Sequence, residues 1–113
     1  MKTETLELTL LFDYYGDMLT DKQKTCFELH YHQDLSLGEI VEEIGISRQG
    51  VHDTLARTET ALRGMEERLG CVSRARDLQR AYGELMAVSE ELRTAGQSRL
   101  AKRIDAAAKL VKE

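Results

Sequence analysis

The 113 residues of this chain are enough for about one domain with a single modest core. Hydrophobic residues make up 42% and charged residues 32%, which is typical of soluble globular proteins and excludes the disordered and membrane classes. No apolar run approaches the roughly 18 residues that span a bilayer, and the N-terminus carries acids where a secretory signal carries bases. We therefore expect a cytoplasmic protein with no membrane span.

The composition predicts an all-α fold. The chain has no proline and only 5% aromatic residues, and it is rich in Leu, Ala, Glu, Lys, Arg and Gln, which favour helices. The two cysteines, Cys26 and Cys71, lie far apart and outside any zinc-binding spacing. We expect two free thiols, no metal and no cofactor.

Two helices are predicted before residue 35. Leu6–Tyr15 is densely apolar, which indicates a helix buried on two sides, and Gly16 is expected to stop it. Thr20 then opens the sequence T-D-K-Q, a capping box in which Gln23 reaches back to the cap residue. The second helix should end near residues 33–34.

The most informative stretch is residues 36–63. Ser36 opens a second capping box, S-L-G-E, with Glu39 at the third helical position. Gly45 can adopt the left-handed conformation of a tight turn, and Ser47 can cap the next helix. Between these caps, apolar residues recur at i, i+3, i+4 and i+7, namely Leu37, Ile40, Val41 and Ile44.

The helix after Ser47 has two different faces. An inward face is marked by Val51, Leu55, Leu62 and Met65. Polar side chains project outward near its start, which is typical of the recognition helix in a helix-turn-helix. The alternative is that 36–63 holds two ordinary helices of a bundle. The candidate nucleic-acid-binding residues are Ser47, Arg48, Gln49, Gly50, His52, Asp53 and Arg57.

Charge is divided unevenly along the chain, whose formal net charge is −4. Residues 1–70, the expected helix-turn-helix domain, hold seven Lys and Arg against fourteen Asp and Glu, a net charge of −7. Residues 71–113 hold nine against six, a net charge of +3. Affinity for nucleic acid depends heavily on neutralising phosphates, so the first domain needs a local basic strip. We expect Arg48, Arg57 and Arg63 to form it.

A C-terminal helical pair is predicted over residues 71–113. Cys71–Ser73 is expected to be a hinge, with Ser73 capping a helix over Arg74–Thr94, and residues 95–98 break the pattern. The last helix should bury one side and expose five basic residues. The buried set is Leu100, Ile104, Ala107, Ala108 and Val111, and the exposed set is Arg99, Lys102, Arg103, Lys109 and Lys112.

The apolar sides of these two helices need a covering surface. It can be the first domain or the same region of a second subunit, and we expect a homodimer. The basic face of the last helix is interpreted as a solvated surface, with RNA or another acidic partner as the alternative.

No constellation of residues indicates an enzyme. His30 and His32 point about 200° apart on a helix and cannot share one metal ion. His52 is adjacent to Asp53 rather than one turn away, so it lacks an oriented partner for base catalysis. No glycine-rich phosphate loop is present.

The runs LFDYYG, LTDKQ, DLSLGEI and SRQGV-D, within residues 6–70, resemble the bacterial YlxM family. The resemblance implies a fold similar to region 4 of sigma-70 factors, in the winged-helix-like DNA-binding superfamily. It also implies a regulatory role in the signal recognition particle pathway, because the family's genes lie beside that of the particle's GTPase. The motif carries over at Ser47, Arg48, Gln49 and Asp53. The chain departs from many relatives at Gly50 and His52, where they carry Ala and an aromatic residue.

Two functions follow as hypotheses. The first is a regulator whose recognition helix enters the major groove of DNA, with a dimer setting the half-site spacing. The second is an accessory protein that docks the signal recognition particle GTPase or, through the basic tail, the particle's RNA.

Overall fold

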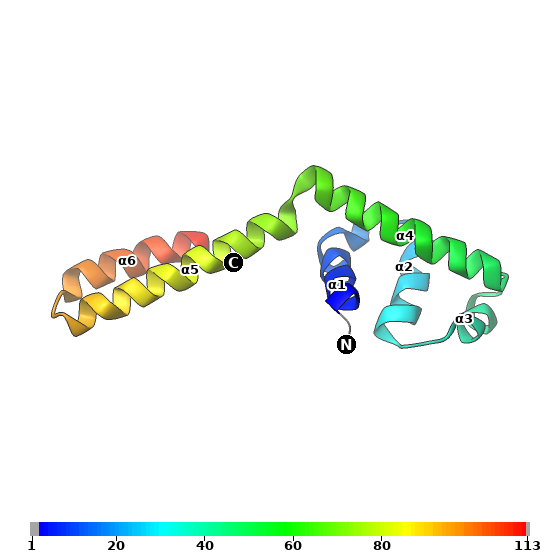
Figure 1. Ribbon diagram of the computed structural model, residues 1–113, viewed down its shortest axis with the longest axis horizontal. Coiled ribbons are helices and arrows are strands. Elements are labelled where there is room, and N and C mark those ends of the chain that lie inside the picture. Colours follow the sequence, from blue (N-terminus) through cyan, green and yellow to red (C-terminus); the bar gives the residue numbers. More distant parts are fainter. Residues whose placement is uncertain (1–2, 113) are drawn as a thin grey trace. The chain divides into compact units, whose positions relative to one another are not determined.

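The computed structural model describes residues 3–112, and every regular element among them is helical. The chain forms two compact units, one ending at Gly70 and one beginning at Cys71. The prediction of an all-α fold is confirmed, and none of the helices within residues 3–112 is long and apolar enough to cross a bilayer. Figure 1 labels the α-helices. The elements are α1 (Thr3–Tyr15), η1 (Gly16–Met18), α2 (Asp21–Phe27), η2 (Glu28–His32), α3 (Leu37–Ile44), α4 (Arg48–Leu69), α5 (Cys71–Thr94) and α6 (Ser98–Val111).

The first helix ends where it was predicted to end, for a different reason. Gly16 does not adopt a left-handed conformation but starts the short 3₁₀ turn η1. A Cβ atom on Gly16 would lie 3.2 Å from the ring of Phe12. That ring stacks on Phe27 with centroids 4.4 Å apart. Position 16 therefore favours glycine, because the stacked rings leave little room for a side chain.

The second helix begins at the predicted cap and changes pitch before it ends. Both hydrogen bonds of the Thr20 capping box are present. After Phe27 the helix widens into the π-helical turn η2, which ends at His32, next to the predicted end. The sequence carries no signal for this wider turn, which holds Tyr31 with its ring 4.5 Å from that of Phe27.

The helix-turn-helix is formed by α3 and α4, and its predicted caps are confirmed. Ser36 and Glu39 form the capping box, and Gly45 ends α3 in a left-handed conformation with φ 71°. Figure 1 shows α1, α2 and α3 on one side of α4. The core that joins α2, α3 and α4 is made of fully or almost fully buried Cys26, Ile40, Val51 and Leu55. Burial raises the pKa of the Cys26 thiol, so it is an unreactive core residue.

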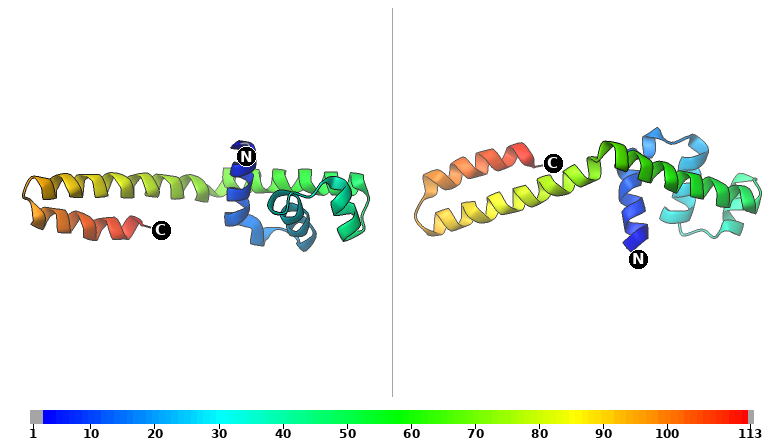
Figure 2. Two further views of the ribbon diagram at one scale, coloured as in Figure 1. Left: turned by 90° about the horizontal axis from the view of Figure 1, so that it is seen from below. Right: turned by 45° about the horizontal axis from the view of Figure 1, so that its top comes forward.

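The second unit is an antiparallel hairpin of α5 and α6, connected by a turn in which Gly96 has φ 78° (Figure 2). The predicted hinge at Cys71–Ser73 and the predicted cap at Ser73 are wrong, because these residues belong to α5. Gly70 ends α4 with φ 63°, and its amide donates to the carbonyl of Glu66. One left-handed glycine is enough to end one helix and start the next, so no linker is needed.

The predicted buried side of α6 is confirmed in part, since Ala108 is fully buried and Ile104 and Val111 are half-buried. Ala101 and Ala108 are fully buried, whereas Leu100 is 38% exposed and Ala107 is also exposed. The facing surface of α5 contributes the fully buried Ser89. Small side chains let the two helix backbones approach, and for this reason the fully buried Ala101 was missed while the larger Leu100 was wrongly expected to be buried.

Candidate nucleic-acid interface

The start of α4 is fixed by its cap. The Oγ of Ser47 accepts a hydrogen bond from the amide of Gly50 at 3.0 Å, which satisfies one of the free donors of the helix N-terminus. The turn before it is held by the left-handed Gly45. The first turns of α4 are therefore presented on a rigid support rather than on a loop.

Gly50 lies close against this cap. A Cβ atom at this position would lie 3.1 Å from the Oγ of Ser47 and 3.5 Å from the Cδ1 of Ile46. A larger residue would push against the cap and the turn.

The predicted outward residues are all exposed on the N-terminal half of α4: Arg48, Gln49, His52, Asp53 and Arg57. Three of them, Gln49, Asp53 and Arg57, follow one another at i, i+4 and i+8, which places them along one line of the helix. The Nε2 of Gln49 donates to Asp53 at 2.8 Å, and the Nδ1 of His52 lies 3.6 Å from the same carboxylate. We call these five residues the recognition face.

Arg63 does not extend the basic strip as predicted. Its guanidinium lies 3.7 Å from the carboxylate of Glu4 on α1, so its charge is compensated within the unit. The strip is therefore reduced to Arg48 and Arg57. Ion pairs between positions so far apart in sequence leave no signal in helical periodicity.

Two acids of α4 are held on the side that faces the rest of the unit. The hydroxyl of Tyr31 donates to Glu59 at 2.9 Å, and that of Tyr15 donates to Glu66 at 2.5 Å. Burial, followed by the hydrogen bond and the charge of Glu59, raises the pKa of Tyr31, so it remains a donor. Asp53 is left as the one acid in the first ten residues of α4, beside Arg48 and Arg57.

The histidines are placed in structural surroundings. The ring of His32 lies edge-on to Phe12 and Phe27, and the Nδ1 of His30 lies 3.1 Å from the carbonyl oxygen of Leu35. Within residues 3–112, no group of three or more His, Cys, Asp or Glu side chains is arranged to hold a metal ion.

Comparison with known proteins agrees with this geometry. The chain is 53% identical over 78 residues to a UPF0122 protein of Thermoanaerobacter sp. (strain X514), covering 69% of this chain and 67% of the relative. It is 42% identical over 92 residues to a UPF0122 protein of Bacillus cereus (strain AH187), covering 80% and 84%, and 41% identical over 87 residues to one of Listeria welshimeri, covering 77% and 79%. Residues 2–102 match the UPF0122 family, described as "Putative helix-turn-helix protein, YlxM / p13 like", and the resemblance therefore continues into the second unit. The chain belongs to the YlxM/p13-like family of helix-turn-helix proteins.

Proposed function

We propose that this protein is a binding protein, not an enzyme, that acts as a regulator or accessory of the signal recognition particle pathway and binds duplex DNA through the recognition face. The observation that carries the proposal is the rigid, capped start of α4 with five polar side chains exposed on it. An exposed polar face on the second helix of a helix-turn-helix is the geometry that enters a major groove.

The residues of this site have different roles in the proposal. Arg48 and Arg57 stand about 14 Å apart along the helix axis, given a rise of 1.5 Å per residue, and would contact phosphates. Gln49 and Asp53 are suited to base edges, because Gln pairs with adenine and Asp accepts from cytosine N4. Ser47 and Gly50 hold the helix start, whose free amides favour a phosphate.

The pathway is the part of the proposal that comes from resemblance, and the homodimer is retained as an expectation from the sequence, although α5 and α6 pack against each other in the hairpin. A homodimer would place two recognition helices on half-sites about 34–36 Å apart. The proposal locates the protein in the cytoplasm, where its ligands are found.

A second candidate function is docking of the signal recognition particle GTPase without sequence-specific DNA binding. It is favoured by the net charge of −7 on residues 1–70 and by Asp53 in the middle of the recognition face. An acidic surface repels phosphates and attracts a basic protein surface.

The test is a titration of the full chain against random duplex DNA, signal recognition particle RNA and the GTPase, each at low and at physiological salt. The variant R48A/R57A should weaken DNA binding by about tenfold or more, since each lost phosphate contact lowers affinity and salt dependence. The matched control is R63A/R68A, which removes the same charge from the second half of α4 and should bind nearly as the natural chain does. Equal losses in the two variants, with helicity retained, would remove the recognition face from the proposal. Tight GTPase binding without DNA binding would favour docking.

A further inference from the structure

The outer side of α6 carries a continuous row of positive charge. Arg99, Lys102, Arg103 and Lys109 are all exposed, and they fall within about a third of the helix circumference, opposite the buried Ala101 and Ala108. We call these four residues the basic stripe. Lys112 is not part of it, because its ammonium lies over the ring of Tyr82, 5.8 Å from the centroid.

The single acid of α6, Asp105, lies at the edge of the stripe, one helical turn before Lys109, and forms its ion pair with α5. Asp105 accepts a hydrogen bond from the hydroxyl of the buried Ser89 at 2.5 Å and forms an ion pair with Arg93 of α5. These contacts lower the pKa of Asp105, with the Ser89 hydrogen bond as the largest cause, so its charge is fixed inside the hairpin. Within residues 3–112, no carboxylate forms an ion pair with Arg99, Lys102 or Arg103.

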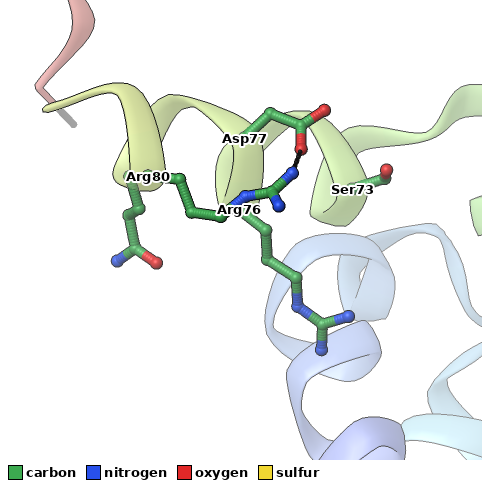
Figure 3. A pocket seen from close by; sticks show the side chains of 5 residues that line it. Ser73, Arg76, Asp77 and Arg80 are labelled. Atoms are coloured by element: carbon green, nitrogen blue, oxygen red, sulfur yellow. Dashed lines mark hydrogen bonds and ion pairs between the residues drawn. The ribbon is translucent and has the colours of Figure 1, made fainter. Parts of the chain in front are cut away.

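The first turns of α5 provide the contrast. Ser73, Arg76, Asp77, Gln79 and Arg80 line an open hollow there, and Figure 3 shows the bond from Arg80 to Asp77 within it. That cluster mixes both signs of charge, as an ordinary solvated helix surface does. The basic stripe itself contains no acid, and the acid beside it, Asp105, forms its ion pair with Arg93 of α5.

The exposed apolar residues favour a polyanion over a lipid surface as the partner. Leu110 is 87% exposed and Leu100 38% exposed on α6, and two leucines ten residues apart do not form the wide apolar face that interfacial helices need to insert. Arg99 and Lys109 are about 15 Å apart along the axis, given the helical rise, which is the length of several phosphates on one strand. Arginine and lysine in a row without acids are suited to that backbone.

We propose that the basic stripe is a second DNA-contacting surface, which binds the phosphate backbone of duplex DNA without reading its sequence. The inference rests on the proposed function in its choice of DNA. It also supplies what the first unit lacks, because residues 1–70 carry a net charge of −7 and residues 71–113 carry +3. In this proposal the recognition face orients the protein on duplex DNA, and the basic stripe adds electrostatic affinity for the phosphate backbone.

The test measures the salt dependence of binding of the full chain to a random DNA duplex. In the variant R99Q/K102Q/R103Q, the slope of log affinity against log salt should become less steep by about 2 to 3. Binding at moderate salt should weaken by about tenfold or more. The variant R99K/R103K keeps the charges and should keep the slope. The control R74Q/R76Q/R80Q removes three charges from α5 and should change the slope by less than about 1.

Each outcome decides the inference. An unchanged slope in R99Q/K102Q/R103Q, or an equal change in the α5 control, would show that the stripe is not a specific backbone contact. If R99Q/K102Q/R103Q loses binding to duplex RNA or to phosphatidylserine vesicles but keeps its binding to duplex DNA, the inference is also overturned. If R48A/R57A leaves DNA affinity unchanged while the stripe variant weakens it, the proposed role of the recognition face fails and the stripe stands alone.

Discussion

The two units of this protein are stabilised by different means. Residues 1–70 carry a net charge of −7 and enclose large side chains, with Phe27, Leu8 and Ile40 almost fully buried. Residues 71–113 carry +3, and the fully buried side chains between α5 and α6 are small: Ala101, Ala108 and Ser89. The first unit holds the recognition face on a packed core, and the second carries the basic stripe on a helical hairpin.

The two candidate surfaces depend on different structural features. The recognition face depends on caps, a left-handed glycine and a packed core, because it must hold a few side chains in register. The basic stripe depends only on the rotation of α6 against α5, which the Ser89, Arg93 and Asp105 cluster fixes. A substitution that destabilises one unit should therefore leave the other folded.

The largest effect is expected from a cavity in the first unit. Ile40→Ala removes a fully buried side chain between α2, α3 and α4 and should destabilise that unit by about 3 kcal/mol. Hydrogen exchange resolved by residue should show faster exchange in residues 3–69 with α6 unchanged. Leu110→Ala, at an exposed site, is the control and should change stability by less than about 0.5 kcal/mol. Equal exchange in both units would mean that they do not unfold separately.

Overpacking should break the second unit selectively. Ala101→Leu inserts a large side chain where α6 meets α5 and should cost about 2 kcal/mol, because the helices cannot both keep their spacing. Ala106→Leu makes the same chemical change on the exposed side of α6 and should be almost neutral. Thermal unfolding followed by circular dichroism measures both. A stable A101L hairpin would contradict the close contact of α5 and α6.

A smaller effect is expected at the turn of the helix-turn-helix. Gly45→Ala forces a side chain into a left-handed conformation with φ 71° and should cost about 1–2 kcal/mol. Gly64→Ala, within α4 and with open space around it, should instead stabilise the unit by about 0.5–1 kcal/mol. Opposite signs in denaturant unfolding are expected. The same sign for both would mean that the turn is not strained by a side chain.

The smallest effects are expected from pH, and each unit offers one carboxylate. The backbone hydrogen bond from Ser36, followed by that from its side chain, lowers the pKa of Glu39, and the Ser89 hydrogen bond followed by Arg93 lowers that of Asp105. A lowered pKa in the folded state adds stability that is complete above the ordinary value, 4.5 for Glu39 and 3.8 for Asp105, and is lost as pH falls through the folded-state value. Glu39→Gln should flatten the acid dependence of the first unit alone, and Asp105→Asn that of the second alone. Acid titrations of the two variants, monitored by residue-resolved hydrogen exchange, check this.

Much of the first unit could be predicted because its signals are local. Both capping boxes, Gly45, the Ser47 cap and the exposure of the recognition face depend on residues within one or two turns of each other. The missed features depend on partners distant in sequence. Tyr31 meets Glu59 across 28 positions, and Arg63 meets Glu4 across the unit. Periodicity identifies which side of a helix is apolar, and it does not identify which polar groups meet.

The second unit was predicted less well for a related reason. The hairpin and its turn follow from periodicity and from Gly96, but the rotation of α6 was set by Ala101 and Ser89, which carry little hydrophobic weight. The hinge at Cys71–Ser73 was expected from a shift in composition, while Gly70 alone makes the break. Which residues of the candidate site contact a ligand remains a prediction of the pattern and the family.

The central claim is that the recognition face binds duplex DNA, and amide chemical shifts test it most directly. A ¹⁵N-labelled full chain titrated with random duplex DNA should show its largest shifts at the amides of residues 47–57, with smaller shifts along α6. Shifts confined to α6, or shifts on the first unit that avoid the start of α4, would contradict the account.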